Sequence, residues 1–331
     1  MLTEPTKTDP PKRRRRWYQF SLRTLMIFTM ICAIGCAWLA HKIERKRKER
    51  ETVAAIVKSG GRAYYDYEIE NGRRVKAPKP RGPDWLRQLL GENFFNDVKV
   101  VEFSGPDTIT DAELEHLRGL THLQELHVFD ATNVTDAGLE NLSGLIQLQR
   151  LHLTGSNVTD AGLESLSGLT QLEVLDLDKT KVTDAGLAKL RGLTRLRCLN
   201  VARTNVMGAG LESLNDLPQL EVLDLDETKV TDAGLVKLKG LTRLGWLKLG
   251  STKVTDAGLV NLTELHQLQC VTLTDTNVTD AGPEVLKSLT QLRLLELDRS
   301  NVTYAGWKRL RKAFPACQIS SSVLVPDPRD D

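Results

Sequence analysis

A segment close to Val-Thr-Asp-Ala-Gly-Leu recurs along most of this 331-residue chain at almost constant spacing. The first interval is 25 residues and every later one is 24. Between the copies stands the pattern Leu-x-x-Leu-x-Leu, as in Leu172, Leu175 and Leu177. A period of roughly 20–50 residues predicts a stack of like units, because one such unit cannot bury its own apolar face. The nine copies begin at Ile109, Val134, Val158, Val182, Val206, Val230, Val254, Val278 and Val302.

Each unit divides into a short strand, a turn and a short helix. Leu175 and Leu177 share one face of the strand, since side chains alternate along it, and we expect them to point inward. The hydroxyl of Thr180 is expected to satisfy backbone groups buried in the turn. Thr183 and Asp184 then supply a side-chain acceptor for the free N–H groups at the start of the helix.

Three units depart from the pattern. The last of them carries Tyr304 and Trp307, as expected near a cap, and the other two predict local differences. Met207-Gly208 replaces Thr-Asp in one unit, so we expect that helix to lose its N-cap, which is worth about 1 kcal/mol. Pro283 stands where most other units carry the first helical Leu. A helix tolerates proline there only if the residue lies in its first turn.

The chain begins with a basic head on an acidic body. Residues 1–50 hold 13 Lys+Arg and 4 Asp+Glu, a net of +9, which leaves 32 basic and 39 acidic groups, a net of −7, in the other 281. Within the head, the sixteen residues 25–40 carry no charge. As a helix they would span about 24 Å, against a hydrocarbon core of about 30 Å, and the run lengthens if it is counted from Phe20.

We therefore predict a single-pass transmembrane helix, with basic residues at the lipid headgroups and aromatic residues at the interface. A cleaved signal peptide is disfavoured because no small-x-small site ends the apolar run. The apolar run could also carry a lipid-modified Cys36, or form a buried helix of a soluble protein. The residues assigned to the anchor are Arg13, Arg14, Arg15, Arg16, Trp17, Tyr18, Phe20, Leu25, Ile27, Phe28, Ile31, Ile34, Trp38 and Leu39.

Both flanks of the apolar run are basic, so the charge bias across it is small. The N-terminal flank has no acidic residue near the run, and a short tail with undiluted positive charge is usually retained inside. We therefore expect the repeat domain to be extracytoplasmic. The basic run lacks the spaced aromatic residues and the zinc or helix-turn-helix patterns of nucleic-acid binders, so its expected partner is membrane lipid rather than nucleic acid.

The order of these segments predicts the organisation of the chain. A helix that starts at Asp84 and carries Trp85, Leu86, Leu89 and Leu90 on one face directly precedes the repeats. Because an open solenoid end must be covered, we expect it to form part of a cap. The predicted divisions are a basic tail (1–20), a transmembrane helix (21–41), a charged helix with a short strand and linker (42–83), an N-terminal cap (84–97), a solenoid of about nine repeats (98–320) and a C-terminal tail (321–331).

The full unit, Leu-x-x-Leu-x-Leu-x-x-Thr-x-Val-Thr-Asp-Ala-Gly-Leu-x-x-Leu-x-x-Leu-x-x, resembles the leucine-rich repeat family over about residues 98–320. The resemblance implies an α/β solenoid, or horseshoe, with parallel β-strands on the concave face and short helices on the convex face. With its N-terminal anchor, the chain resembles a bacterial single-pass membrane-anchored leucine-rich repeat protein. That resemblance carries no particular biochemical role.

The concave strand face is the first place to look for a binding site. Its outward columns are expected to combine an apolar stripe centred on Trp246 with pairs of acidic residues, which would suit a protein partner with basic and apolar groups. A face that serves only solubility is the competing interpretation. The candidate partner-binding residues are Val174, Asp176, Asp178, Val222, Asp224, Asp226, Trp246, Lys248, Leu294, Glu296 and Asp298.

Catalytic and metal chemistry is weakly indicated. Asp176 and Asp178 should lie about 6–7 Å apart on one face, but no general acid, nucleophile or oxyanion element accompanies them, so a charged surface is favoured over Ca²⁺ binding or catalysis. His127 and His152 should lie about 4.8 Å apart, with Glu125 the nearest third ligand, and are interpreted as exposed polar residues. We predict no cofactor, no metal and no small-molecule substrate.

Together these features predict a membrane-anchored, non-catalytic protein-binding or scaffold module that acts through its concave face. A soluble adaptor, of the ubiquitin-ligase-adaptor or ribonuclease-inhibitor type, is the second hypothesis. It requires the apolar head to be something other than an anchor. A hydrolytic enzyme that uses the concave carboxylates is the third.

Overall fold

The computed structural model describes residues 22–70, 73–76, 78–105 and 109–321. The chain divides into two compact units, Met1–Arg47 and Lys48–Asp331. The predicted headgroup and interface residues, namely Arg13 to Arg16, Trp17, Tyr18 and Phe20, lie outside the described residues, as does the C-terminal tail beyond residue 321.

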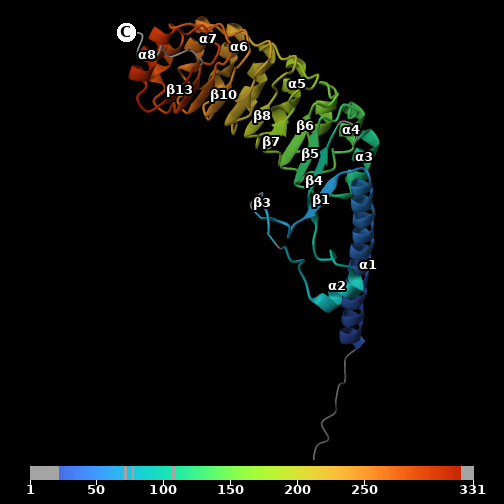
Figure 1. The fold of residues 1–331 in the computed structure, drawn as a ribbon. Coiled ribbons are helices and arrows are strands. Elements are labelled where there is room, and N and C mark those ends of the chain that lie inside the picture. Colours follow the sequence, from blue (N-terminus) through green and yellow to red (C-terminus); the bar gives the residue numbers. More distant parts are fainter. Residues whose placement is uncertain (1–21, 71–72, 77, 106–108, 322–331) are drawn as a thin grey trace, which may run out of the picture. The chain divides into compact units, whose positions relative to one another are not determined.

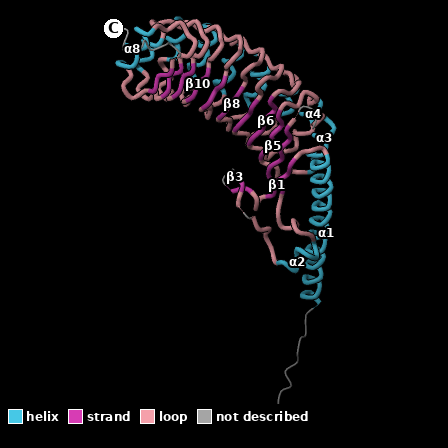
Figure 2. The backbone as a smooth tube through the Cα atoms, in the orientation of Figure 1, coloured by secondary structure: helices cyan, strands magenta, loops and turns pink. Residues whose placement is uncertain are grey.

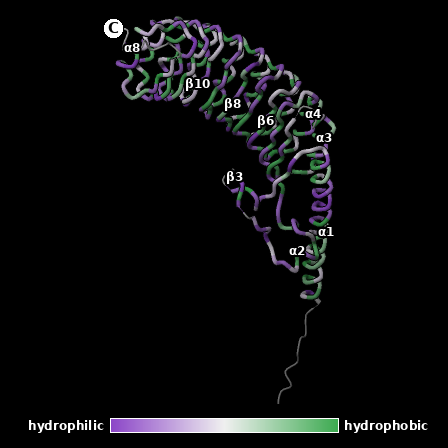
Figure 3. Tube along the Cα trace, in the orientation of Figure 1, coloured by the Kyte–Doolittle hydropathy of each residue, from purple (hydrophilic) through white to green (hydrophobic). Residues whose placement is uncertain are grey.

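The N-terminal helix α1 (Leu22–Lys58) is one continuous element of 37 residues. The sequence predicted a membrane helix over 21–41 and a separate charged helix after it, but no helix-breaking residue stands between the two and the helix continues. Its apolar and charged stretches follow each other as green and purple segments in Figure 3. Among the described residues, α1 is the one helix long and apolar enough to cross a membrane, and none of its apolar window is buried.

The core of the second unit is covered at its N-terminal end by several short segments. β1 (Arg62–Tyr65) pairs antiparallel with β4 (Val98–Ser104), and Ile56, Tyr65 and Phe94 are buried there. A Cβ at Gly61 would lie 2.6 Å from the Phe103 ring, so the chain passes tightly over the first repeat. In contrast, α2 (Asp84–Leu90), which the sequence placed in the cap, has no buried residue. Between β1 and α2 along the chain, β2 (Ile69–Glu70) and β3 (Arg73–Arg74) pair antiparallel as a small hairpin.

One sheet of 11 strands runs through the described part of the second unit in the order β1, then β4 to β13. From β4 onward every neighbouring pair is parallel and in register, so that Leu223, Leu247 and Val271 align. Figure 1 shows these strands side by side along the inner edge of a curved array. They are β5 (Glu125–Phe129), β6 (Arg150–Thr154), β7 (Val174–Asp176), β8 (Cys198–Asn200), β9 (Val222–Asp224), β10 (Trp246–Lys248), β11 (Cys270–Thr272), β12 (Leu294–Glu296) and β13 (Gln318–Ser320).

Short helical turns line the outer edge of the same array, opposite the strands (Figure 2). The α-helices are α3 (Asp111–His116), α4 (Asp136–Glu140), α5 (Asp184–Leu187), α6 (Asp232–Leu235), α7 (Asp256–Leu259) and α8 (Tyr304–Ala313). The 3₁₀ turns are η1 (Leu117–Gly119), η2 (Gly162–Leu166), η3 (Ala188–Gly192), η4 (Ala209–Asp216), η5 (Val236–Gly240), η6 (Val260–Leu262) and η7 (Pro283–Ser288). Pro283 is the first residue of η7, where its missing N–H is harmless.

The core is a continuous column of leucine and valine side chains. Leu175 and Leu177 are both fully buried, which confirms their inward assignment. The hydroxyl of Thr180 is buried and donates to the carbonyl of Leu177 at 2.7 Å, as the sequence predicted. Thr204, Thr228, Thr252 and Thr276 repeat this bond in the later turns.

The Thr-Asp-Ala-Gly segment links successive turns to one another. Thr183 caps its own helix by accepting from the N–H of Ala185 at 3.2 Å. Its own N–H and hydroxyl donate to the two carboxylate oxygens of Asp160, in the preceding turn, at 2.8 and 2.6 Å. A Cβ at Gly186 would overlap that carboxylate, so glycine makes room for it. We expected the aspartate, like the threonine, to cap its own helix. Its carboxylate instead accepts hydrogen bonds from the threonine of the next turn.

This ladder of Asp–Thr bonds is interrupted once. Asp184 accepts from the N–H groups of Met207 and Gly208, at 3.3 and 3.0 Å, in place of a threonine. As predicted, η4 starts without a side-chain cap. Because Gly208 has no carboxylate, Thr231 in the following turn lacks the acceptor that the other turns provide.

Candidate functional site: the concave face and its strand-start groove

Each short strand places one side chain in the core and two on the concave face. On β9, Leu223 is buried while Val222 is half-buried and faces outward. The predicted partner-binding residues therefore all lie along this face. Val174 and Asp176 are on β7, Val222 and Asp224 on β9, Trp246 and Lys248 on β10, and Leu294 and Glu296 on β12, while Asp178, Asp226 and Asp298 lie two residues past their strands.

The acidic residues of the face are mostly engaged within the chain, which the sequence did not predict. Asp178 is buried and accepts two bonds from the Arg203 guanidinium, one of them at 2.8 Å from Nε. Asp224 is buried and pairs with the Lys248 ammonium at 2.8 Å. The carboxylate of Asp298 accepts from the hydroxyl of Ser320. The face thus offers less free negative charge than the count of its carboxylates indicates.

Asp226 is held by a backbone donor of the next turn. Burial, followed by the nearby charge of Asp224, raises its pKa from the ordinary 3.8 to about 6. One of its oxygens accepts from the N–H of Gly250 at 2.6 Å. The absence of a side chain at Gly250 lets the carboxylate lie across the next turn, because a Cβ there would come within 3.1 Å of it.

His127 and His152 stack on the face near its N-terminal end. Their ring centroids are 4.7 Å apart with the planes 17° from parallel, and Phe129 lies 5.9 Å from each ring. Nε2 of His127 is 3.3 Å from Glu125, and this hydrogen bond, helped by the charge of Arg150, holds the pKa of Glu125 below its ordinary value. Stacked rings do not converge on one point, and in the described residues no three His, Cys, Asp or Glu are placed to hold a metal.

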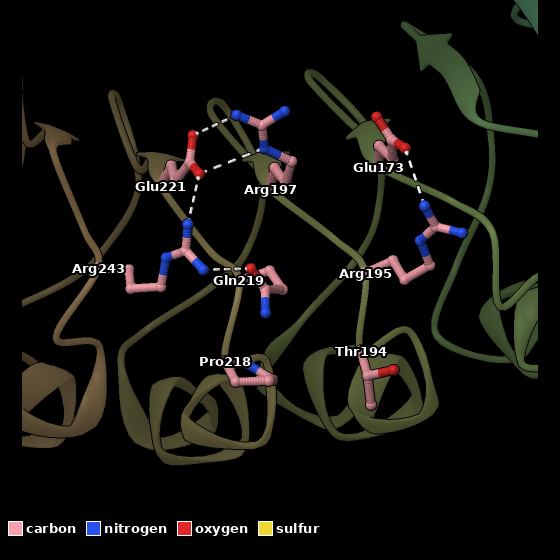
Figure 4. A pocket seen from close by; sticks show the side chains of 8 residues that line it. All are labelled: Glu173, Thr194, Arg195, Arg197, Pro218, Gln219, Glu221 and Arg243. Atoms are coloured by element: carbon pink, nitrogen blue, oxygen red, sulfur yellow. Dashed lines mark hydrogen bonds and ion pairs between the residues drawn. The ribbon is translucent and has the colours of Figure 1, made fainter.

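A second feature runs along the residues that immediately precede the strands. A hollow of about 570 Å³ opens there, and Figure 4 shows the side chains that line it. Arg197 holds Glu221 through two contacts, at 2.8 and 3.3 Å, and Arg243 approaches the same carboxylate at 3.4 Å. Arg195 lies 3.7 Å from Glu173. The hydrogen bond from Arg197, together with the charges of Arg197 and Arg243, lowers the pKa of Glu221.

A smaller hollow of about 270 Å³ adjoins the first and shares Glu221 and Arg243 with it. Its other lining residues are Gly245, Trp246, Gln267 and Gln269. We call the two hollows together the strand-start groove. It was missed from the sequence, although one signal was visible: Gly245 interrupts a register in which the neighbouring turns carry Glu221 and Gln269.

The stacked strand–turn–helix units, their buried leucines and their in-register parallel sheet define a leucine-rich repeat solenoid. The family model "Leucine-rich repeat region" matches residues 156–317, and the model "Leucine Rich repeat" matches residues 119–143. The chain is a leucine-rich repeat protein. A search of curated proteins found no match.

Similar solved structures include two internalins from Listeria monocytogenes. Internalin C2 is 25% identical, with a TM-score of 0.49, over 65% of this chain and 85% of that one. The internalin InlF is 21% identical, with a TM-score of 0.44, over 65% of this chain and 72% of that one. The plant peptide hormone receptor RGFR1, solved in complex with RGF2, is 16% identical, with a TM-score of 0.44, over 63% of this chain and 34% of that one.

Proposed function

We propose that this protein is a membrane-anchored, non-catalytic module that binds a protein partner on its concave face, with the contact centred on β10. The observation that carries the proposal is Trp246, a residue that is 48% exposed on β10, with three further strands of the sheet beyond it. Tryptophan is enriched among the residues that dominate binding energy at interfaces. A large exposed ring on a rigid strand offers apolar area at little cost in conformational entropy.

The sequence of β10 supports the same centre. Among the strands from β5 to β12, β10 is the one that has glycine directly before it, tryptophan as its first residue and lysine as its third. Gly245 follows Glu221 in register, Trp246 follows Val222, and Lys248 follows Asp224. The inward residue is leucine in both strands (Leu223 and Leu247), so the core packing is alike and only the outward side chains differ. Changes confined to the outward positions are what a binding role would produce and what packing alone would not require.

The carboxylates support binding over hydrolysis. A general acid and base need side chains that are free to exchange protons with a substrate. Asp178 and Asp224 are instead buried against Arg203 and Lys248. Such internal pairs fix the shape of the face and its pattern of charge.

The anchor rests on α1. Its apolar side chains, which include Leu25, Ile27, Phe28, Ile31, Ile34, Trp38 and Leu39, are all exposed in the first unit. Exposed apolar area on this scale needs a nonpolar environment. A signal sequence near an N-terminus can be as long and as apolar, but no small-x-small cleavage site ends this run, which favours an uncleaved anchor with the repeats on the extracytoplasmic side. Retention of the full-length chain in membranes after carbonate washing, and its release by detergent, would support an anchor. Release by carbonate would favour the soluble adaptor.

Binding is tested with the full chain in lipid nanodiscs, presented to extracts of its native host. The Trp246→Ala variant should lose a captured protein that wild type retains. Trp85→Ala is the matched control, since Trp85 is 67% exposed but lies on α2, outside the face. Equal capture by wild type and both variants, or loss with Trp85→Ala alone, would reject the concave face as the binding surface.

A further inference from the structure

The hollow beside Trp246 exists because one residue lacks a side chain. From β5 to β12, the residue directly before the strand is polar in every turn but one, the exception being Gly245. The other positions of this register are Gln124, Gln149, Glu173, Arg197, Glu221, Gln269 and Arg293.

The fold does not require glycine at this position. A Cβ at Gly245 would find its nearest neighbours at 3.6 Å (Gln267 O) and 3.8 Å (Glu221 O), which are ordinary contacts. Gly245 is also not among the glycines with positive φ in the described chain. Gly186 is different, since its Cβ would overlap Asp160. The effect of Gly245 is therefore on the surface, where it keeps the hollow beside the Trp246 ring open.

The free hydrogen-bonding groups of this hollow are mainly donors. Both oxygens of Glu221 already accept from arginines. A guanidinium has five N–H donors, and Arg243 uses one on Gln219 and one on Glu221. Within the described part of the chain, the side-chain amides of Gln267 and Gln269 make no hydrogen bond. An occupant with acceptor oxygens would satisfy these donors.

The charge of the strand-start groove points the same way. Three guanidiniums, those of Arg195, Arg197 and Arg243, line it beside two carboxylates, those of Glu173 and Glu221. Arginine is always ionised in proteins, so one positive charge is uncompensated. Guanidinium binds carboxylate through parallel N–H bonds, and the adjoining Trp246 ring offers apolar contact to the stem of the bound side chain.

We infer that the hollow formed by Arg243, Gly245, Trp246 and Gln269 receives an acidic side chain of the protein partner, with its carboxylate on Arg243 and its aliphatic stem against Trp246. This inference rests on the proposed function and names one element that the partner must present. It differs from the sequence-based expectation of a basic partner, because the carboxylates of Asp178, Asp224, Asp226 and Asp298 already accept hydrogen bonds inside the chain.

The test uses a display library of short random peptides, selected on the full chain in nanodiscs. Selected peptides are then measured by interferometry against four variants. Gly245→Gln fills the hollow with the side chain that Gln269 carries in the next turn, and Arg243→Gln removes the charge. The matched controls are Gly144→Gln, where a Cβ meets nothing within 4 Å, and Arg118→Gln, an exposed arginine on η1. Thermal melting of each variant shows whether it is folded.

The inference expects the selected peptides to share an Asp or Glu residue. Their affinity should fall at least about tenfold with Arg243→Gln and with Gly245→Gln, as expected for losing a charge-assisted hydrogen bond, and should hold with both controls. Replacing the acid in the peptide by its amide should cause a like loss. Peptides that need Trp246 but tolerate both groove variants, or that are enriched in basic residues, would overturn the inference and leave the proposed function standing. Failure to select any peptide that depends on Trp246 would overturn both.

Discussion

Gly258→Ala tests the bonds that join one turn of the solenoid to the next. A methyl group at this position would overlap the Oδ1 atom of Asp232. That carboxylate accepts from the N–H and the hydroxyl of Thr255, at 2.8 and 2.7 Å, and cannot move aside without losing them. Two hydrogen bonds to a charged, partly exposed group are worth about 2–4 kcal/mol together. The alanine stabilises the protein by about 0.4–1 kcal/mol because it restricts the unfolded chain, so we expect a net loss of about 1–3.5 kcal/mol.

The chain supplies its own control for this experiment. Gly234 occupies the same place in the preceding unit, but Gly208 stands where the aspartate would be, and a Cβ at 234 has its nearest atom at 3.1 Å. Gly234→Ala should therefore change stability by less than about 1 kcal/mol. Both variants are compared with wild type by urea unfolding in mild detergent, followed by circular dichroism, at unchanged slope. Equal losses in the two variants would refute the assignment of the glycine to the aspartate ladder.

Three further outcomes follow from the structure. Leu223→Ala, which leaves a cavity at a fully buried position, should lower the free energy of unfolding by about 2–5 kcal/mol. Trp246→Ala should lower it by under about 1 kcal/mol. Similar shifts in melting temperature for the two variants would contradict the assignment of Leu223 to the core and Trp246 to the surface. Thr252→Val removes a buried hydroxyl that donates to a backbone carbonyl at 2.6 Å and should lower stability by about 1–2 kcal/mol; an unchanged urea midpoint would show the bond to be dispensable. The pKa of Asp226 is raised from 3.8 to about 6, so its neutral form favours folding below about pH 4 and this contribution is lost as the pH rises through about 6. Asp226→Asn should therefore be more stable than wild type near pH 7.5 and nearly equal to it near pH 4, and the reverse order would contradict the burial of this group.

The repeat period allowed most of the solenoid to be predicted, because its determinants are local. Leucine spacing sets which residues enter the core, as Leu175 and Leu177 show, and the hydroxyl of Thr180 bonds a carbonyl only three residues away. What escaped prediction depends on contacts between turns. Asp160 bonds Thr183, 23 residues later, and Asp178 is held by Arg203, 25 residues later. Neither partner can be read from one unit alone.

The candidate site was predictable in its position but not in its chemistry. The alternation of side chains placed Trp246 on the concave face, where it is exposed. We expected the acidic residues of the face to be free to bind a partner. Their pairing with Lys248 and Arg203 depends on the conformations of these long side chains, which the sequence does not reveal. The strand-start groove was not predicted because it depends on Gly245, which has no side chain. A search of the sequence for reactive or binding side chains does not detect such a position.

Site-specific photocrosslinking in native membranes tests the central claim most directly. A photoreactive amino acid is placed at position 246 on the concave face and, in a second variant, at position 146, where Ile146 is 60% exposed in the segment between α4 and β6. The account predicts a discrete protein adduct from position 246 that position 146 does not give. Adducts of the same kind and yield from both positions, or none from 246, would contradict it.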